Sequence, residues 1–215
     1  MNKFKNLVFD FNGTIIDDVQ VCLDILNKML ANSNHPQISL DQYLHTFTFP
    51  IYDYYIKAGF DIKPNGKDNF EELSKYFDKS YRAIFNKLKP FPDIVPFLKN
   101  NYQKYNLYIL SATKQNDLEN ELKQLNIYNY FRAVIGINNI FAYSKVNEAI
   151  EYFTKNNIKS AETAFIGDTT HDNEVAKKLN ATSILIARGH QAKDVLEKTN
   201  ANYVISNIKE LERIL

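Results

Sequence analysis

The chain has 215 residues, of which 45% are hydrophobic and 24% are charged, and its formal net charge at pH 7 is +1. This composition is typical of a globular protein, and the near-neutral charge gives no reason to expect nucleic acid or a membrane surface as a partner. The single cysteine, Cys22, has no partner for an internal disulfide, and no apolar run approaches the length of a membrane span. We therefore expect a cytoplasmic protein with one core domain and a modest insertion.

The predicted elements begin with a strand at 7–11 and an amphipathic helix at 17–31, which Asp17 and Asp18 are placed to cap. From there to about residue 89 the pattern is helical and aromatic, and three prolines interrupt it. Regular alternation of strands and helices follows Pro90-Phe91-Pro92. It comprises strands at 106–111, 133–137, 163–167, 183–187 and 203–205, helices at 93–104, 116–125, 145–156 and 172–179, and a terminal helix.

This alternation predicts an α/β fold, with a doubly wound parallel sheet and right-handed crossovers. The predicted core consists of residues 1–16 and 90–215. Residues 17–89 are predicted to form a small α-helical domain, which is inserted between the first and second strands.

The motif that organises the chain is Phe9-Asp10-Phe11-Asn12-Gly13-Thr14, directly after the first apolar run. A buried parallel strand delivers its last residues to the carboxyl edge of the sheet, where open α/β sheets bind their ligands. Asp10 there suits a nucleophile or a metal ligand, and Gly13 lets the backbone turn closely around a ligand. Taken alone, the motif is more typical of an Asp that caps the next turn, and the partners of Asp10 later in the chain change this.

Three later motifs supply partners for Asp10. Asp168 and Asp172 follow the apolar run Phe165-Ile166-Gly167, Ser111 ends the strand Leu107–Leu110, and Lys145 stands at the head of a predicted helix. Phosphoryl transfer requires this combination, namely an in-line nucleophile, a divalent cation and groups that bind the equatorial oxygens.

Together, the four motifs resemble the signature of the haloacid dehalogenase-like hydrolases, over essentially the whole chain. The resemblance implies an Asp10 nucleophile that forms an aspartyl-phosphate and a phosphate site at Ser111, Ala112 and Lys145. It also implies a Mg²⁺ site formed by Asp10, the Asn12 carbonyl, Asp168 and Asp172. The helical insertion resembles the small cap domain of the phosphoglycolate phosphatase-like branch, whose substrates are small phosphomonoesters.

Asn12 departs from the family pattern, in which a second Asp serves there as general acid and base. A carboxamide donates hydrogen bonds but does not exchange protons near neutral pH, so a loss of about 10²- to 10⁴-fold in rate is expected. Four explanations stay open: a substitute proton shuttle such as His171 or His190, vestigial activity, an engineered substitution, or partial deamidation of Asn12-Gly13 to Asp.

The sequence therefore predicts a magnesium-dependent hydrolase of a small phosphorylated metabolite, active as a monomer or homodimer. The alternative is a catalytically impaired protein that binds phosphate or a metabolite. Hydrolysis of a phosphonate is less favoured, because its cap lysine would be Lys57, which nothing else marks. A haloacid hydrolase needs no metal, so the pair Asp168 and Asp172 speaks against it.

The aromatic stretch Phe47–Lys57 lies in the predicted cap and has two interpretations. It either touches the leaving group of the substrate or packs as a stripe against a neighbouring helix. We expect Cys22 to belong to helix packing, and Thr169 and Thr170 to cap the helix that follows them. Thr113 and Lys114 are expected either to help hold phosphate or to lie in a surface loop.

Overall fold

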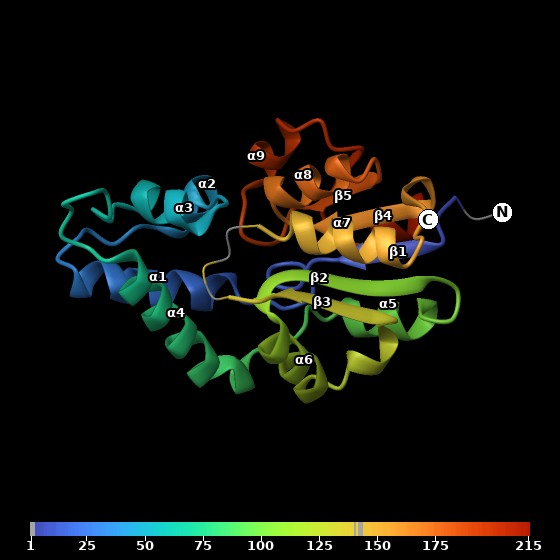
Figure 1. Ribbon diagram of the computed structural model, residues 1–215, viewed down its shortest axis with the longest axis horizontal. Helices are drawn as coiled ribbons and strands as arrows, with labels where there is room; N and C mark the ends of the chain where they lie inside the picture. Colours follow the sequence, from blue (N-terminus) through green and yellow to red (C-terminus); the bar gives the residue numbers. More distant parts are fainter. Residues whose placement is uncertain (1–2, 140, 142–143) are drawn as a thin grey trace.

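The computed structural model describes residues 3–139, 141 and 144–215. Within them, a six-stranded, all-parallel sheet has the order β3-β2-β1-β4-β5-β6, with β1 at the centre between β2 and β4 (Figure 1). The chain thus winds outward from β1 first in one direction and then in the other, which confirms the predicted doubly wound α/β fold. The strands are β1 (Asn6–Phe9), β2 (Asn106–Lys114), β3 (Ala133–Ile137), β4 (Thr163–Gly167), β5 (Thr182–Ile186) and β6 (Tyr203–Ile205).

Both faces of the sheet are buried, because side chains alternate between the two faces and helices pack on each of them. In β1, Leu7 and Phe9 belong to one apolar cluster, which includes residues of α5, α6 and α10, whereas Val8 belongs to another, which includes residues of α7 and α8. The helices of the sheet domain are α5 (Ile94–Asn101), α6 (Gln115–Gln124), α7 (Val146–Lys155), α8 (Thr170–Lys178), α9 (Lys193–Glu197) and α10 (Ile208–Ile214). Single 3₁₀ turns are η1 (Phe85–Lys87), η2 (Tyr128–Tyr130) and η3 (Ser160–Glu162).

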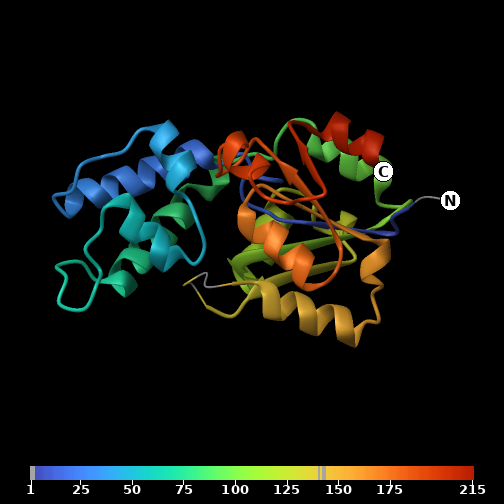
Figure 2. The ribbon, with the colours of Figure 1, turned by 90° about the horizontal axis from the view of Figure 1, so that it is seen from above.

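Four helices form a separate lobe beyond one end of the sheet, shown in blue to green at the left of Figures 1 and 2. We call α1–α4 the helical lobe. Its interior is apolar and aromatic, with Leu26, Met29, Tyr43, Tyr54 and Tyr55 all buried. The helices are α1 (Val19–Asn32), α2 (Leu40–Thr46), α3 (Ile51–Ala58) and α4 (Phe70–Ile84).

Two chain segments connect the lobe to the sheet, and they run side by side. The Asp17 amide donates to the Lys89 carbonyl at 3.0 Å, and the Phe91 amide donates to the Ile15 carbonyl at 2.9 Å. Ile16 and Pro90 also form an antiparallel bridge. This paired crossing supports domain boundaries at 16/17 and 89/90, which stay a prediction.

Element ends differ slightly from the predictions. The strand β1 ends at Phe9, so Asp10 and Phe11 lie in the turn that follows, and β2 continues to Lys114 with an irregularity in its pairing with β3.

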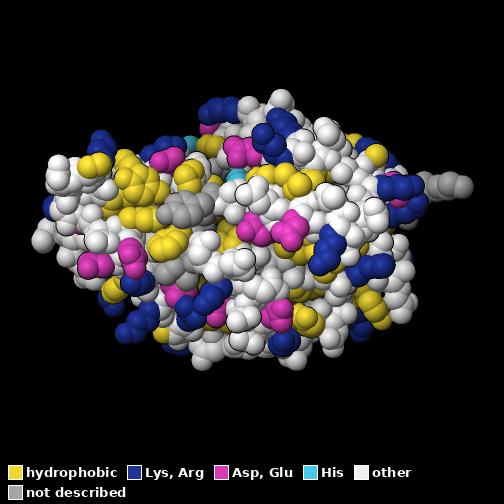
Figure 3. Space-filling model, viewed as in Figure 1, with side chains coloured by type: hydrophobic (Ala, Val, Ile, Leu, Met, Phe, Trp, Pro, Cys, Tyr) yellow, Lys and Arg dark blue, Asp and Glu magenta, His cyan; other side chains and the backbone are white. Residues whose placement is uncertain are grey.

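No helix in the described part of the chain is both long enough and apolar enough to cross a membrane. Space-filling representation shows apolar side chains gathered over the helical lobe, whereas charged side chains spread over the sheet domain (Figure 3).

Candidate active site

Three carboxylates meet at the carboxyl edge of the two central strands. Asp10 follows β1, Asp168 follows β4, and Asp172 lies in the first turn of α8. Oxygen atoms of the three side chains all lie within 4.8 Å of one another. Asp168 and Asp172 are buried, and the Asp10 side chain is only 12% exposed. The predicted nucleophile and metal ligands are therefore brought together.

Two glycines allow this close approach. A Cβ atom at Gly167 would stand 2.1 Å from the Cγ atom of Asp172, and one at Gly13 would stand 2.4 Å from the Oδ2 atom of Asp168. Gly13 also has a φ of +66°, which side chains disfavour. Any larger residue would push these carboxylates apart.

Lys145 lies between two of the carboxylates, although it comes from a distant part of the sequence. Its Nζ atom forms ion pairs with Oδ1 of Asp10 and, at 2.6 Å, with Oδ1 of Asp172, and it donates to the Leu110 carbonyl at 3.1 Å. The side chain is 4% exposed. Lys145, at the N-cap of α7, was predicted to pair with the nucleophile, and the structure places it there.

The cluster has more negative than positive charge. Burial, aided by Asp172 and Asp168, raises the pKa of Asp10 to about 8 against the attraction of Lys145. Burial and Asp172 likewise raise the pKa of Asp168 to about 6, although His190 opposes this. The pKa of Lys145 is itself raised, because Asp10 and Asp172 outweigh the effect of burial. One lysine thus balances three carboxylates only partly, so an added cation would be favoured there.

Further hydrogen bonds fix the orientation of Asp168 and Asp172. Oδ1 of Asp168 accepts from the Thr14 hydroxyl at 2.7 Å, and Oδ2 accepts from the His190 amide at 2.7 Å. Oδ2 of Asp172 accepts from the amide and the hydroxyl of Thr169, at 2.9 and 2.7 Å. The last two bonds close the N-terminus of α8, in line with the predicted capping role of Thr169.

The predicted phosphate-binding residues lie at the end of β2. Ser111 is buried, its hydroxyl donates to Oγ1 of Thr113 at 3.0 Å, and it accepts from the Thr113 amide at 3.1 Å. Ser111, Ala112, Thr113 and Lys114 all line the same cavity as Asp10. This cavity has a volume of about 190 Å³ and lies where the sheet edge meets the helical lobe.

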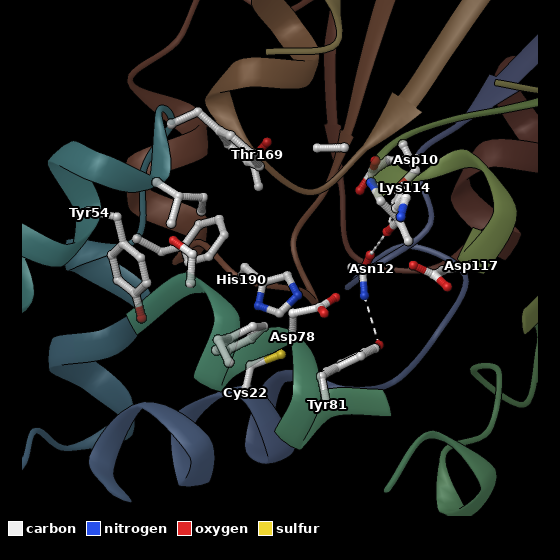
Figure 4. A pocket seen from close by; sticks show the side chains of 18 of the residues that line it. Asp10, Asn12, Cys22, Tyr54, Asp78, Tyr81, Lys114, Asp117, Thr169 and His190 are labelled. Carbon is white, nitrogen blue, oxygen red and sulfur yellow. Dashed lines mark hydrogen bonds between the residues drawn. The ribbon is translucent and has the colours of Figure 1, made fainter. Parts of the chain in front are cut away.

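Asn12 makes side-chain contacts to three residues, and Figure 4 draws two of them as dashed lines. Its Nδ2 group donates to Oδ2 of Asp18 at 2.6 Å and to the Tyr81 hydroxyl at 2.8 Å, and its Oδ1 accepts from the Thr113 hydroxyl at 3.1 Å. The amide therefore joins the turn after β1 to the start of α1, to α4 and to β2 at the cavity edge.

The prediction that Asp18 caps α1 is wrong. Asp18 occupies the N-cap position, but its side chain makes no capping hydrogen bond and is completely buried. Its carboxylate accepts instead from the Gly13 amide at 2.9 Å, from Asn12 and from the Tyr81 hydroxyl at 2.8 Å. Paired acidic residues at a helix start predict capping, and only the approach of α4 redirects Asp18 toward the site.

His190 forms a buried ion pair with Asp18. Its Nε2 atom lies 3.3 Å from Oδ1 of Asp18, and its Nδ1 atom lies 2.8 Å from the Tyr43 hydroxyl. Asp18 raises the pKa of His190 to about 9 against the effect of burial, and His190 in turn lowers the pKa of Asp18. Both partners are therefore charged at neutral pH.

His171 is also engaged at both ring nitrogens. Its Nδ1 atom lies 3.1 Å from Oε2 of Glu174, and its Nε2 atom lies 3.4 Å from both the Lys145 amide and the Ser144 hydroxyl. Neither of the two histidines considered as proton shuttles thus presents an unpartnered ring nitrogen to the cavity.

The aromatic stretch Phe47–Lys57 packs within the helical lobe, as one of its two interpretations expects, and several of its rings also border the cavity. The Phe47 and Phe49 rings stack on His190 and His171, with centroid distances of 4.9 and 4.8 Å. Tyr54 and Tyr55 are buried within the helical lobe and also line the cavity. Lys57 is exposed on α3 and does not line the cavity, so the helical lobe offers no lysine there for the phosphonate interpretation.

Sequence reasoning missed Tyr43 and Tyr81, which bring two hydroxyl groups to the site from the helical lobe. Both lie within a chain that is rich in tyrosine, so nothing in the pattern distinguishes them. Cys22 is buried as predicted, but its Sγ atom also lies 3.7 Å from Oδ2 of Asp18.

The family model described as haloacid dehalogenase-like hydrolase matches residues 7–186. The chain belongs to the haloacid dehalogenase-like hydrolases. The match begins within β1 and ends with β5, so it includes the strand ends that carry Asp10, Ser111 and Asp168. The resemblance that the four motifs suggested is confirmed.

Curated relatives and solved structures agree with this assignment. A phosphoglycolate phosphatase from Vibrio vulnificus is 21% identical, over 97% of this chain and 95% of its own. A pyrophosphatase PpaX from Listeria monocytogenes is 22% identical, over 99% and 97%. A haloacid dehalogenase-like family protein from Streptococcus pneumoniae has the same fold, with a TM-score of 0.83, 18% identity and 99% of both chains covered.

Proposed function

We propose that this protein is a magnesium-dependent hydrolase of small phosphomonoesters that works through an aspartyl-phosphate on Asp10. The observation that carries the proposal is the convergence of Asp10, Lys145, Asp168 and Asp172 on one cavity, next to the hydroxyl of Ser111. Phosphoryl transfer requires little of a protein beyond this set of positioned charges.

In the proposed reaction, the Asp10 carboxylate attacks the phosphorus atom and the alkoxide leaves. Water then attacks the phosphoenzyme, releases inorganic phosphate and restores Asp10. Lys145 holds Asp10 in position and offsets charge on the equatorial oxygens. Ser111 and the amide of Ala112 supply hydrogen bonds to those oxygens.

The donor set fits Mg²⁺. Asp10, Asp168, Asp172 and the Asn12 carbonyl offer only oxygen ligands, which this ion prefers, and the excess negative charge of the cluster favours a cation. When bound, Mg²⁺ would draw electron density from the phosphoryl group and neutralise developing charge. The Thr14, Thr169 and His190 hydrogen bonds keep the carboxylates aligned for it.

We further propose that turnover is slow because proton transfer to the leaving group is impaired. Asn12 cannot supply a proton, and both nitrogens of His190 and of His171 have partners. Among substrates that bind equally well, those with a leaving group of low pKa, which departs without protonation, would therefore react fastest.

The helical lobe is proposed to act as the cap, over residues 17–89. It covers the sheet edge through hydrogen bonds from the Gln191 side chain to the Phe47 carbonyl, at 2.7 Å, and from the Ala192 amide to the Leu44 carbonyl, at 3.1 Å. We place the protein in the cytoplasm, as a monomer or homodimer.

The test is phosphate release from para-nitrophenyl phosphate and small alkyl phosphates, with Mg²⁺ and with a chelator. The proposal expects release that needs both Mg²⁺ and Asp10. The competing function is binding of phosphate or a metabolite without turnover, which the partnered Asn12 and His190 favour. Binding without release of phosphate from any substrate would support that alternative.

A further inference from the structure

One wall of the cavity carries an unusual group of charges from two helices. Asp78 and Arg82 come from α4 in the helical lobe, and Asp117 and Glu121 come from α6 in the sheet domain. Within each pair the residues are four positions apart, so they lie on one face of their helix. Figure 4 shows Asp78 and Asp117 around the same space as Asn12 and Asp10.

The single arginine of this group does not satisfy the carboxylates. Arg82 pairs with Asp78 and donates to Oδ1 of Asp117 at 2.9 Å. Oδ2 of Asp117 and Oε2 of Glu121 remain buried without a hydrogen-bond partner among the described residues. Glu121 is only 6% exposed, yet it lines the cavity. A buried carboxylate oxygen that faces a cavity without a partner indicates that a ligand supplies the missing donor.

The electrostatics of Glu121 indicate the sign of that ligand. Burial, together with Asp117 and Asp18, raises its pKa to about 8, and Arg82 opposes this only partly. Without a ligand, the carboxyl therefore holds a proton at neutral pH. A ligand cation would take the place of that proton and pair with the ionised group.

Aromatic rings stand beside these carboxylates. Phe77 and Tyr81 line the cavity from α4, and their rings stack with centroids 6.1 Å apart and an interplanar angle of 14°. Ring faces attract cations, and most strongly where water is excluded. Unpaired carboxylate oxygens next to aromatic rings are the features expected of a site for an organic ammonium group.

Three cations line the cavity among the described residues, and Arg82 and His190 are paired with carboxylates, so Lys114 is the one that would favour the opposite charge. It lies at the end of β2, next to Thr113, and is exposed. That position adjoins the proposed phosphoryl site, whereas Glu121 lies two helical turns further along α6. Lys114 is thus placed to offset charge on the phosphoryl group rather than on the leaving group.

We propose that the leaving group of the substrate carries an amine, whose ammonium form binds Glu121 and Asp117 beside the rings of Phe77 and Tyr81. The substrate class is thus the phosphomonoesters of small amino alcohols. This inference rests on the proposed phosphatase function and goes beyond it, because it excludes leaving groups with a carboxylate, as in phosphoglycolate.

The test compares three matched substrates, 2-aminoethyl phosphate, 2-hydroxyethyl phosphate and phosphoglycolate, whose leaving groups are cationic, neutral and anionic. We expect kcat/KM to be roughly tenfold or more higher for the aminoethyl ester than for the hydroxyethyl ester, with phosphoglycolate lowest. Glu121→Gln should remove most of that preference and change hydrolysis of the hydroxyethyl ester by less than about threefold. Glu119→Gln, on the outer part of the same helix, is the matched control. It should change neither the preference for the aminoethyl ester nor the hydrolysis of the hydroxyethyl ester.

Equal rates for the aminoethyl and hydroxyethyl esters would overturn the inference, and so would a preference for phosphoglycolate or pyrophosphate. An equal loss on all three substrates in Glu121→Gln would show that this residue has only a structural role.

A binding experiment separates this inference from the proposed function. Calorimetric titration of the Asp10→Asn variant with 2-aminoethyl phosphate and 2-hydroxyethyl phosphate needs no turnover. Tighter binding of the amine that depends on Glu121, in a protein that releases no phosphate, would sustain the ammonium site and reject the phosphatase. Phosphate release without any preference for the amine, in turnover or in binding, would support the phosphatase function and reject the ammonium site.

Discussion

The carboxyl edge of the sheet and the helical lobe contribute to the site in different ways. The sheet edge supplies charges, namely Asp10, Lys145, Asp168 and Asp172, from turns and helix starts that directly follow strands. The lobe supplies aromatic rings and hydroxyls from the sides of helices, as Tyr43 and Tyr81 show. Backbone geometry places the first set, whereas side-chain packing between domains places the second.

This difference separates two kinds of specificity. Adjacent parallel strands must end at the same edge, so the charges converge in any chain that forms this sheet. Each lobe residue reaches the site only through the angle at which the lobe meets the sheet. The chemistry is therefore expected to depend on the sheet edge, and the choice of substrate on the cavity wall that the lobe forms together with α6.

The largest effect is expected from Asp10→Asn, because the neighbouring carboxylates, Asp168 and Asp172, are proposed to hold the metal and not to attack phosphorus. Phosphate release should fall by at least about 10³-fold. Asp17→Asn, an exposed neighbour, should have no effect. Measuring phosphate release from para-nitrophenyl phosphate with Mg²⁺ checks this, and activity within tenfold of the wild type would reject the nucleophile.

Lys145→Met should lower the free energy of unfolding by about 3–5 kcal/mol, because it leaves Asp10 and Asp172 buried without their cation. Mg²⁺ should restore much of the loss by neutralising the same carboxylates. Urea unfolding with and without Mg²⁺ measures both effects. Lys155→Met, on the exposed side of α7, is the control. A loss that Mg²⁺ does not reduce would argue against a metal at these carboxylates.

The substitution Asn12→Asp tests the place where the sheet edge meets the helical lobe. The new carboxyl would face Asp18, 2.6 Å from the replaced amide nitrogen, so it should hold a proton at neutral pH and act as the missing general acid. Phosphate release from alkyl phosphates should rise by about 10²-fold. Substrates with good leaving groups should gain less. An unchanged rate would mean that another group already transfers the proton.

The smallest effect concerns the contribution of Glu121, on the α6 wall of the cavity, to stability. Burial raises the pKa of Glu121 to about 8 from 4.5, so the folded state keeps a proton that the unfolded state loses. The resulting stabilisation is complete below pH 4.5 and disappears as the pH rises through 8. Glu121→Gln carries no such proton, so it should match the wild type near pH 5 and exceed it by about 1–3 kcal/mol at pH 9. Urea unfolding of both proteins at both pH values measures this. The same pH dependence of the free energy of unfolding in the two proteins would mean that the Glu121 carboxyl is solvated.

The sequence by itself determined the succession of strands and helices along the chain and which residues stand at the strand ends. Short apolar runs that end in Asp10, Ser111 and Asp168 predicted both the parallel sheet and its functional edge. The strands at 133–137, 163–167 and 203–205 have the predicted bounds, because turn residues flank short apolar runs. Lys145 was found only through its place between motifs, since a lysine at a helix start is ordinarily solvated.

Only the tertiary structure decided where the side chains of Asp18, Glu121, Tyr43 and Tyr81 lie and what they contact. A local pattern predicts that Asp18 caps a helix, but α4 brings the Tyr81 hydroxyl to it and the loop after β5 brings His190. The sequence predicts that Glu121 points outward from the helix at 116–125, and this prediction is wrong, because the packing of α6 near α4 buries it. The periodicity of a helix shows which residues share a face, but what that face meets depends on contacts far away in the sequence.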